Sequence, residues 1–80
     1  MNLSVLRIGE MVRFHRKKAR MTQAELAQFA EVGKTVVFDV EKGKATVQLS
    51  TLLRILHVLN IRMQFSGPIM HVFEGENEKS

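Results

Sequence analysis

The stretch MTQAELAQFAEVGKTVVFDVEKGKA, residues 21–45, decides the fold of this 80-residue chain. Near its start, Thr22 is followed three residues later by Glu25, which is the spacing of a capping box at the beginning of a helix. Apolar residues then recur at helical spacing, at Leu26, Ala27 and Ala30. A short helix is therefore predicted over residues 22–30, with these three side chains buried.

A second short helix is predicted directly after it, over Lys34–Lys42. The β-branched run at residues 35–37 would favour a strand on its own, but Gly43 has the position of a residue that ends a helix in the left-handed conformation. Its inward-facing residues are Val37 and Val40, and its outward-facing residues are Val36, Phe38 and Asp39. Two short helices joined by a three-residue turn form a helix-turn-helix, which can place the start of its second helix in the major groove of DNA.

The same stretch contains Gly33-Lys34-Thr35, which resembles the end of a phosphate-binding loop. Such a loop requires another glycine at position 28 and a strand before it. Position 28 is Gln28, and a helix precedes the turn. We therefore interpret Lys34 and Thr35 as the exposed first turn of the second helix rather than as part of a nucleotide site.

Two further helices flank this motif. Residues 7–19 are predicted to form the first, with Ile8 and Val12 on one stripe and Ser4 as a candidate N-cap. The other begins at Gln48 or Ser50 and runs to about Leu59. Its predicted core stripe consists of leucines, at positions 49, 52, 53, 56 and 59.

After Asn60, a candidate left-handed stop, residues 61–65 alternate apolar and polar side chains, which predicts a strand. An isolated strand leaves its backbone groups unpaired, so we expect pairing with the same strand of a second copy in a two-fold dimer. A hairpin with a second candidate strand at residues 69–73, after the Gly67-Pro68 turn, is the alternative, and both pairings could coexist in a four-stranded sheet. The expected dimerisation residues are Ile61, Arg62, Met63, Gln64 and Phe65.

Composition restricts the function classes. The last seven residues carry a net charge of −2, so residues 1–73 hold eleven Lys and Arg against five Asp and Glu, a net charge of +6. A small basic body indicates a polyanionic partner such as nucleic acid. The chain has no Cys, and its histidines at 15, 57 and 71 are too scattered for a metal site. We expect no metal, no cofactor, no catalysis, no membrane partner and no signal peptide, and therefore a cytoplasmic protein.

The segments TQAELAQFAEV and VEKGKATVQLSTLLRILHVLNI resemble the Xre/Cro-type helix-turn-helix family, and within it the HipB-type antitoxins. The resemblance covers about residues 6–66. It implies an all-α, five-helix, lambda-repressor-like domain with a short C-terminal dimerising strand. We accordingly expect a DNA-binding domain at residues 1–66, with its strand at 61–66, and a C-terminal extension at 67–80 that ends in a disordered acidic tail.

The resemblance also implies site residues. In the family, the position of Thr22 caps the first motif helix and contacts phosphate, and the position of Gln23 reaches backbone or bases. An Arg near the end of the first helix, here Arg16, pairs with Glu41. From the residues themselves, Arg13, Arg16 or Lys17 are expected to help with phosphates. The expected DNA-contacting residues are therefore Arg16, Lys17, Thr22, Gln23, Lys34, Thr35, Phe38, Asp39, Lys42 and Lys44.

The sequence departs from the family pattern at several positions. Glu31 stands where the turn usually has Gly, and a non-Gly residue in the left-handed conformation costs on the order of 1 kcal/mol. Phe14, Phe29 and Phe38 occupy positions that are usually polar. Phe38 could pack inward, meet a thymine methyl or meet a partner protein, and a cluster of Phe14 with Phe29 would indicate a protein interface.

These observations leave three hypotheses for function. The first is a homodimeric repressor on a palindromic operator of double-stranded DNA in bacteria, acting on the nucleoid. The resemblance implies that it autoregulates a toxin–antitoxin operon and binds a HipA-like serine/threonine kinase toxin. The second is an interaction protein that mainly restrains a toxin kinase through its phenylalanines or its tail. The third is a stand-alone Xre regulator.

Overall fold

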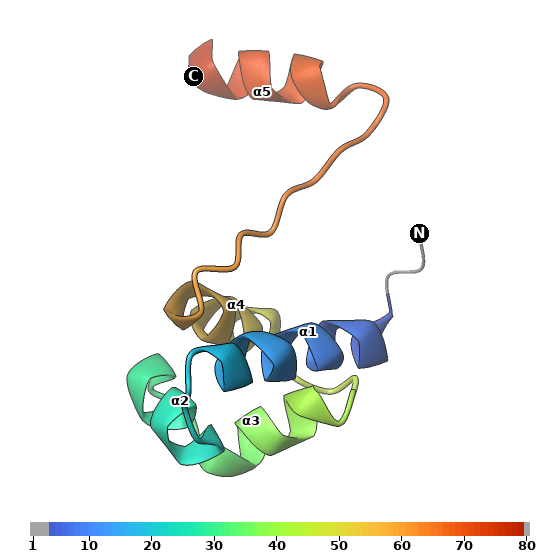
Figure 1. The fold of residues 1–80 in the computed structure, drawn as a ribbon. Helices are drawn as coiled ribbons and strands as arrows, with labels where there is room; N and C mark the ends of the chain where they lie inside the picture. The colour runs from blue at the N-terminus through green and yellow to red at the C-terminus, as the bar shows by residue number, and fades with distance from the viewer. Residues whose placement is uncertain (1–3, 80) are drawn as a thin grey trace.

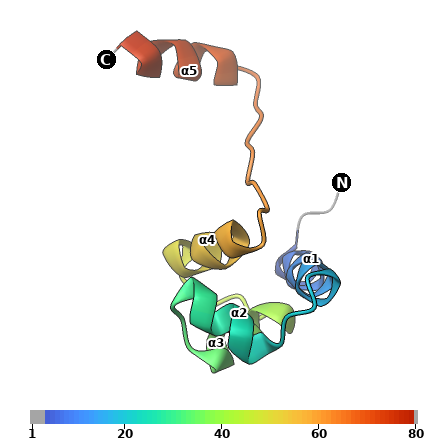
Figure 2. The same cartoon turned by 60° about the vertical axis from the view of Figure 1, so that its left-hand side comes forward.

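Five helices make up the fold, and the first four pack into one body (Figure 1). A computed structural model describes residues 4–79 of the chain and the side chains of residues 4–76. The helices in chain order are α1 (Val5–Lys18), α2 (Gln23–Ala30), α3 (Lys34–Glu41), α4 (Leu49–Val58) and α5 (Met70–Lys79). Both views of the ribbon show α5 standing apart from the body at the end of an extended segment (Figures 1 and 2). No helix among residues 4–79 is long and apolar enough to cross a membrane.

The core lies between the four packed helices. α3 packs against α1 and α2, and α2 also packs against α4. The buried apolar residues, drawn from all four helices, are Val12, Leu26, Ala27, Ala30, Val37, Val40, Leu52, Ile55 and Leu56. Both helices of the predicted helix-turn-helix therefore bury the faces expected of them.

Local capping explains where the first two helices begin. The Ser4 hydroxyl accepts a hydrogen bond from the Arg7 backbone N–H at 3.2 Å, so α1 starts two residues earlier than predicted. At α2 the capping box is present: the Thr22 N–H donates to the Glu25 carboxylate at 2.8 Å, and the Glu25 N–H donates to the Thr22 hydroxyl at 3.0 Å. The predicted N-caps at Ser4 and Thr22 are confirmed.

The turn between α2 and α3 adopts the strained conformation that the sequence indicated. Glu31 has φ 58° and ψ 46°, in the left-handed region. The Val32 N–H bonds the Ala27 carbonyl at 2.9 Å, and the Val32 side chain packs against the core. These contacts end α2 and redirect the chain into α3. At the end of α3, Gly43 has φ 81°, as predicted.

A close approach of α1 to α3 was not visible in the sequence. A Cβ on Gly9 would lie 2.3 Å from the Val40 carbonyl oxygen. Only a glycine at this position lets the two helix backbones meet, and this contact sets the distance of α3 from α1.

Two predictions of side-chain orientation are wrong. Leu49 and Leu53 are 61% and 43% exposed, whereas Ile55, absent from the predicted stripe, is fully buried. The stripe that α4 actually buries follows spacings of three and four residues through Leu52, Ile55, Leu56 and Leu59. Val36, predicted to face outward, is half-buried and packs against the core.

The predicted C-terminal strands are not formed within residues 4–79. Residues 61–67 are extended but carry no strand ladder, because a strand requires a partner for its backbone groups and one chain supplies none here. Residues 70–73 lie at the start of α5 and Ile69 lies in the turn before it, so the hairpin alternative is wrong. The tail that was expected to be disordered is also helical as far as Lys79. The all-α class is confirmed, and the fifth helix belongs to this extension rather than to the packed body.

Candidate nucleic-acid interface

The N-terminal half of α3 carries the exposed side chains that the sequence assigned to base reading. Lys34 and Thr35 are exposed in its first turn, and Phe38 follows on the same side, 46% exposed. Val37 and Val40 anchor the opposite face in the core. Because α3 lies at the side of the body opposite α5, this surface is open to a long ligand (Figure 1).

Phe38 faces outward, so the alternative in which it packs into the core is wrong. The Lys42 ammonium nitrogen lies 5.3 Å from the centre of its ring. This is within the range of a cation–π interaction. The pair places an aromatic face and a positive charge together along the exposed edge of α3.

Asp39, beside Phe38, is the acidic group that would oppose binding of a phosphate. Its carboxylate lies 3.6 Å from the Lys44 ammonium, and its side chain is 32% exposed. Lys44 itself is 58% exposed. The charge of Asp39 is therefore partly neutralised within the chain, while Lys44 still faces solvent near the end of α3.

A buried ion pair connects α1 to α3. Arg16 Nε donates to Glu41 Oε2 at 2.6 Å, and Arg16 Nη2 donates to Glu41 Oε1 at 3.0 Å. The third nitrogen, Nη1, donates to the Met21 carbonyl at 2.8 Å, and the Gln23 amide donates to Glu41 Oε1 at 3.1 Å. One network therefore joins α1, the α1–α2 turn, α2 and α3.

Burial and charge act in opposite directions on this arginine. The hydrogen bond to Glu41 raises the pKa of Arg16, burial lowers it, and the attraction of the Glu41 charge raises it again, with a net increase. Arg16 therefore stays charged across the physiological pH range.

The two expectations for Arg16 have different outcomes. The structure contains its predicted pair with Glu41. Its role as a phosphate contact stays a prediction that the geometry does not favour, because each of the three guanidinium nitrogens donates within the chain and the residue is only 8% exposed. Gln23 is partly committed in the same way, since one N–H of its amide bonds Glu41, while the other N–H and the carbonyl oxygen are left.

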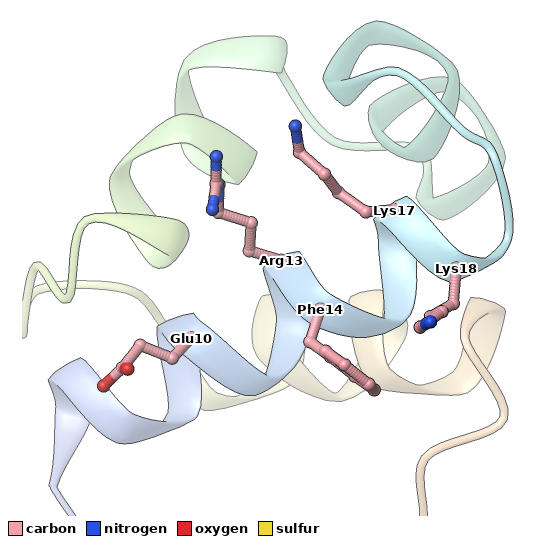
Figure 3. Close-up of a pocket in the computed structure, with 5 residues that line it drawn as sticks. All are labelled: Glu10, Arg13, Phe14, Lys17 and Lys18. Atoms are coloured by element: carbon pink, nitrogen blue, oxygen red, sulfur yellow. The ribbon is translucent and has the colours of Figure 1, made fainter.

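The remaining cations flank α3 from the side of α1. Arg13 and Lys17 are exposed, and Figure 3 shows both side chains extending from α1 toward the side where α2 and α3 lie. The start of α2 adds further donors. Its first backbone N–H groups have no partner inside the helix, and the Thr22 hydroxyl, which accepts from Glu25, keeps its own hydrogen free to donate.

Taken together, the geometry is that of a helix exposed at its N-terminal half, with the exposed cations Arg13, Lys17 and Lys44 on the neighbouring segments. A model of the family described as helix-turn-helix matches residues 12–65, which include all of this surface. The protein belongs to the Xre-type helix-turn-helix family. An uncharacterized HTH-type transcriptional regulator, y4mF, from Sinorhizobium fredii (strain NBRC 101917 / NGR234) is 38% identical over 61 residues, which cover 76% of this chain and 80% of that protein.

Solved structures share the fold of this helix-turn-helix protein. The restriction-modification controller protein C.AhdI from Aeromonas hydrophila is 26% identical with a TM-score of 0.67, over 72% of this chain and 88% of that one. HipB in the HipA-HipB-O2-O3 complex is 20% identical with a TM-score of 0.75, over 85% and 96% of the two chains. HipB in complex with an O4 20mer gives the same identity, TM-score and coverage, at 20%, 0.75, 85% and 96%.

Proposed function

We propose that this protein is a sequence-specific DNA-binding repressor that acts as a homodimer. The observation that carries the proposal is the exposed first turn of α3, Lys34 and Thr35, held outward by the buried residues Val37 and Val40. A helix presented in this way matches the recognition helix of a helix-turn-helix, whose N-terminal residues contact base edges in the major groove.

Base reading is assigned to three side chains of α3. Lys34 would donate to guanine O6 and N7, and the methyl group of Thr35 would contact a thymine methyl. Phe38, one helical turn further on, would lie against a second thymine methyl, with Lys42 beside it directed toward a phosphate. Asp39 stays at the edge of this surface, paired with Lys44.

Phosphate binding is assigned to groups on both sides of α3. Arg13 and Lys17 project from α1 on one side, and Lys44 follows α3 on the other. The Thr22 hydroxyl and the free N–H groups at the start of α2 form an anion-binding helix end. Six to ten phosphate contacts of this kind would lower affinity about 10³–10⁵-fold between 50 and 200 mM salt.

The extended residues 61–65 support the homodimer. Antiparallel pairing of this segment with its copy would satisfy the backbone groups that one chain leaves unpaired. An isologous pair gives a two-fold dimer. The two recognition helices would then lie about one DNA turn apart, ~34 Å, on a palindromic operator.

The antitoxin assignment rests on the resemblance to HipB-type antitoxins, whose fold this chain shares. In this proposal the protein represses its own toxin–antitoxin operon at the bacterial nucleoid and binds a HipA-like serine/threonine kinase toxin. A pure interaction protein is the second candidate, favoured by the exposure of Phe14 and Phe29, at 58% and 67%. A stand-alone Xre regulator is the third.

The experiment that separates these candidates is a gel shift with the DNA immediately upstream of the gene, at two salt concentrations, with unrelated DNA of equal length as control. Tight binding that prefers the upstream DNA and weakens steeply with salt supports the repressor. Equal, weak binding to both DNAs supports the interaction protein. Capture of the product of the neighbouring gene by the purified protein then separates the antitoxin from the stand-alone regulator.

A further inference from the structure

One face of α1 forms an open groove that includes the phosphate-directed residues Arg13 and Lys17 together with an exposed Phe14 that DNA binding does not explain. It has a volume of about 470 Å³ and is lined by Glu10, Arg13, Phe14, Lys17 and Lys18 (Figure 3). Phe14 is 58% exposed at its centre. The Lys18 ammonium lies 5.6 Å from the centre of the Phe14 ring, and the His15 ring meets Phe14 edge-on at 5.6 Å. Phe14 with the Lys18 ammonium against its ring suits a ligand that is both apolar and acidic, and Glu10 is the one acidic side chain among the described residues that line the groove.

The start of α5 has the complementary composition. Ile69, Val72 and Phe73 are 70%, 45% and 62% exposed. Val72, Phe73 and Glu76 recur at intervals of three and four residues, so they share one stripe of α5, and Ile69 precedes this stripe in the turn before the helix. The stripe is apolar at its start and ends in a carboxylate.

We propose that α5 of one copy docks in the α1 groove of a second copy, with Phe73 against Phe14 and Glu76 beside Lys18. The two helices have matching patterns, because each places an aromatic residue one helical turn before a charged one. Phe14 precedes the positive Lys18, and Phe73 precedes the negative Glu76. In a parallel arrangement of α5 on α1, both contacts form in one register.

The occupant of the groove is α5 of a second copy, because the segment that connects α4 to α5 leads away from the body of its own chain. This step rests on the homodimer of the proposed function. Residues 61–67 are extended and carry α5 away from its own α1 (Figures 1 and 2). Antiparallel pairing of residues 61–65 places Phe65 of one copy opposite Ile61 of the other. Each α5 would then emerge at the end of the partner's α4, on the side where the partner's α1 lies, and the Gly67-Pro68 turn would let it change direction.

Docking on the Phe14 and Lys18 side of the groove leaves the base-reading residues of α3 uncovered, although the groove also includes Arg13 and Lys17. Figure 3 shows Phe14 and Lys18 extending away from the side where α2 and α3 lie, opposite to Arg13 and Lys17. The exchanged helices would therefore strengthen the dimer without covering Lys34 or Thr35.

Disulfide trapping tests this arrangement directly, since the chain contains no Cys. Phe14→Cys and Phe73→Cys variants, one carrying a mass tag, are mixed and oxidised mildly. We expect a disulfide between chains of different mass, with a yield far above that of the control pair Gln28→Cys and Phe73→Cys. Gln28 is exposed on α2, outside the groove. A yield no higher than the control overturns the proposal. A double variant with Phe14→Cys and Phe73→Cys that forms its disulfide only within one chain overturns it as well.

A charge exchange and the oligomeric state complete the test. Lys18→Glu should weaken dimerisation up to about five-fold, the upper limit for an exposed ion pair, and adding Glu76→Lys should restore it. Failure of the second substitution to rescue the first contradicts the register. If light scattering finds a stable dimer but no trapped pair forms, α5 exchange is wrong and the homodimer of the proposed function stands. A monomer would overturn both.

Discussion

Arg16 and Glu41 are 25 residues apart in the sequence and form a bidentate ion pair inside the body, with Nε 2.6 Å from Oε2 and Nη2 3.0 Å from Oε1. The pair fixes the C-terminal end of α3 to α1. Because the same guanidinium also bonds the Met21 carbonyl, the turn that leads into α2 is held by the same group. The position of the recognition helix therefore depends on a network that does not itself touch DNA.

Removing one partner of this pair should be strongly destabilising. Glu41→Gln leaves the Arg16 charge buried without its counterion, and such changes cost about 3–5 kcal/mol of the free energy of unfolding. Urea unfolding followed by circular dichroism measures the loss. The control is Glu10→Gln, which breaks the exposed pair with Arg7 at 3.9 Å and should change stability by less than about 1 kcal/mol. Equal effects of the two variants would contradict the structural role of the buried pair.

Gly9→Ala should destabilise the protein although alanine is the better helix former. The gain in helix propensity is about 1 kcal/mol, but the new Cβ would lie 2.3 Å from the Val40 carbonyl oxygen. Forcing α1 away from α3 should cost about 1–3 kcal/mol of the free energy of unfolding. We expect this cost to exceed the gain in helix propensity. The same substitution at Gly33, where a Cβ would meet only Val36 at 3.9 Å, serves as the control. If a thermal melt shows that Gly9→Ala is more stable than the Gly33→Ala control, the backbones of α1 and α3 are not in contact.

Glu31→Gly should stabilise the protein by about 1 kcal/mol, because glycine adopts a φ of 58° without the steric cost that glutamate pays. Gln28→Gly, within α2, should instead destabilise it by about 1 kcal/mol. Chemical denaturation of both variants under the same conditions provides the comparison. If both changes destabilise equally, the left-handed turn at residue 31 is not the strained position.

Phe38→Ala should weaken binding to the upstream DNA and leave binding to unrelated DNA nearly unchanged, because its expected contact is a thymine methyl rather than a phosphate. Phe29→Ala is the matched control, since Phe29 is even more exposed, at 67%, but lies on α2. Fluorescence anisotropy at constant salt measures both. A larger effect of Phe29 than of Phe38 would move DNA binding away from α3.

The parts of the fold that could be predicted from the sequence are those set by neighbouring residues. The capping box at Thr22 and Glu25, the left-handed Gly43, and the inner face of α3 at Val37 and Val40 follow from short-range spacing. The left-handed Glu31 is implied by the resemblance to the family, whose turn usually has Gly there. Helix α3 formed despite its β-branched run because those valines are buried, which shows tertiary packing overriding propensity.

What could not be predicted depends on contacts between distant segments. Leucines 49 and 53 satisfy helical spacing as well as Ile55 does, and only the neighbours of α4 decide which side is buried. Arg16 has two predicted roles because the sequence does not show that Glu41 and Met21 engage each of its three guanidinium nitrogens and bury the residue. Residues 61–65 have the pattern of a strand, but a strand also needs a partner, which the sequence of one chain cannot display.

The central claim is that Lys34 and Thr35 read the operator, and the most direct measurement is the affinity of the Lys34→Ala/Thr35→Ala double variant for the upstream DNA. Fluorescence anisotropy compares it with wild type and with Arg54→Ala, which removes one exposed charge from α4. We predict that the double variant loses about 1–3 kcal/mol, roughly 5- to 150-fold, on the upstream DNA. Its affinity for unrelated DNA should stay close to that of Arg54→Ala. A double variant that binds the upstream DNA as tightly and as selectively as wild type would contradict the account.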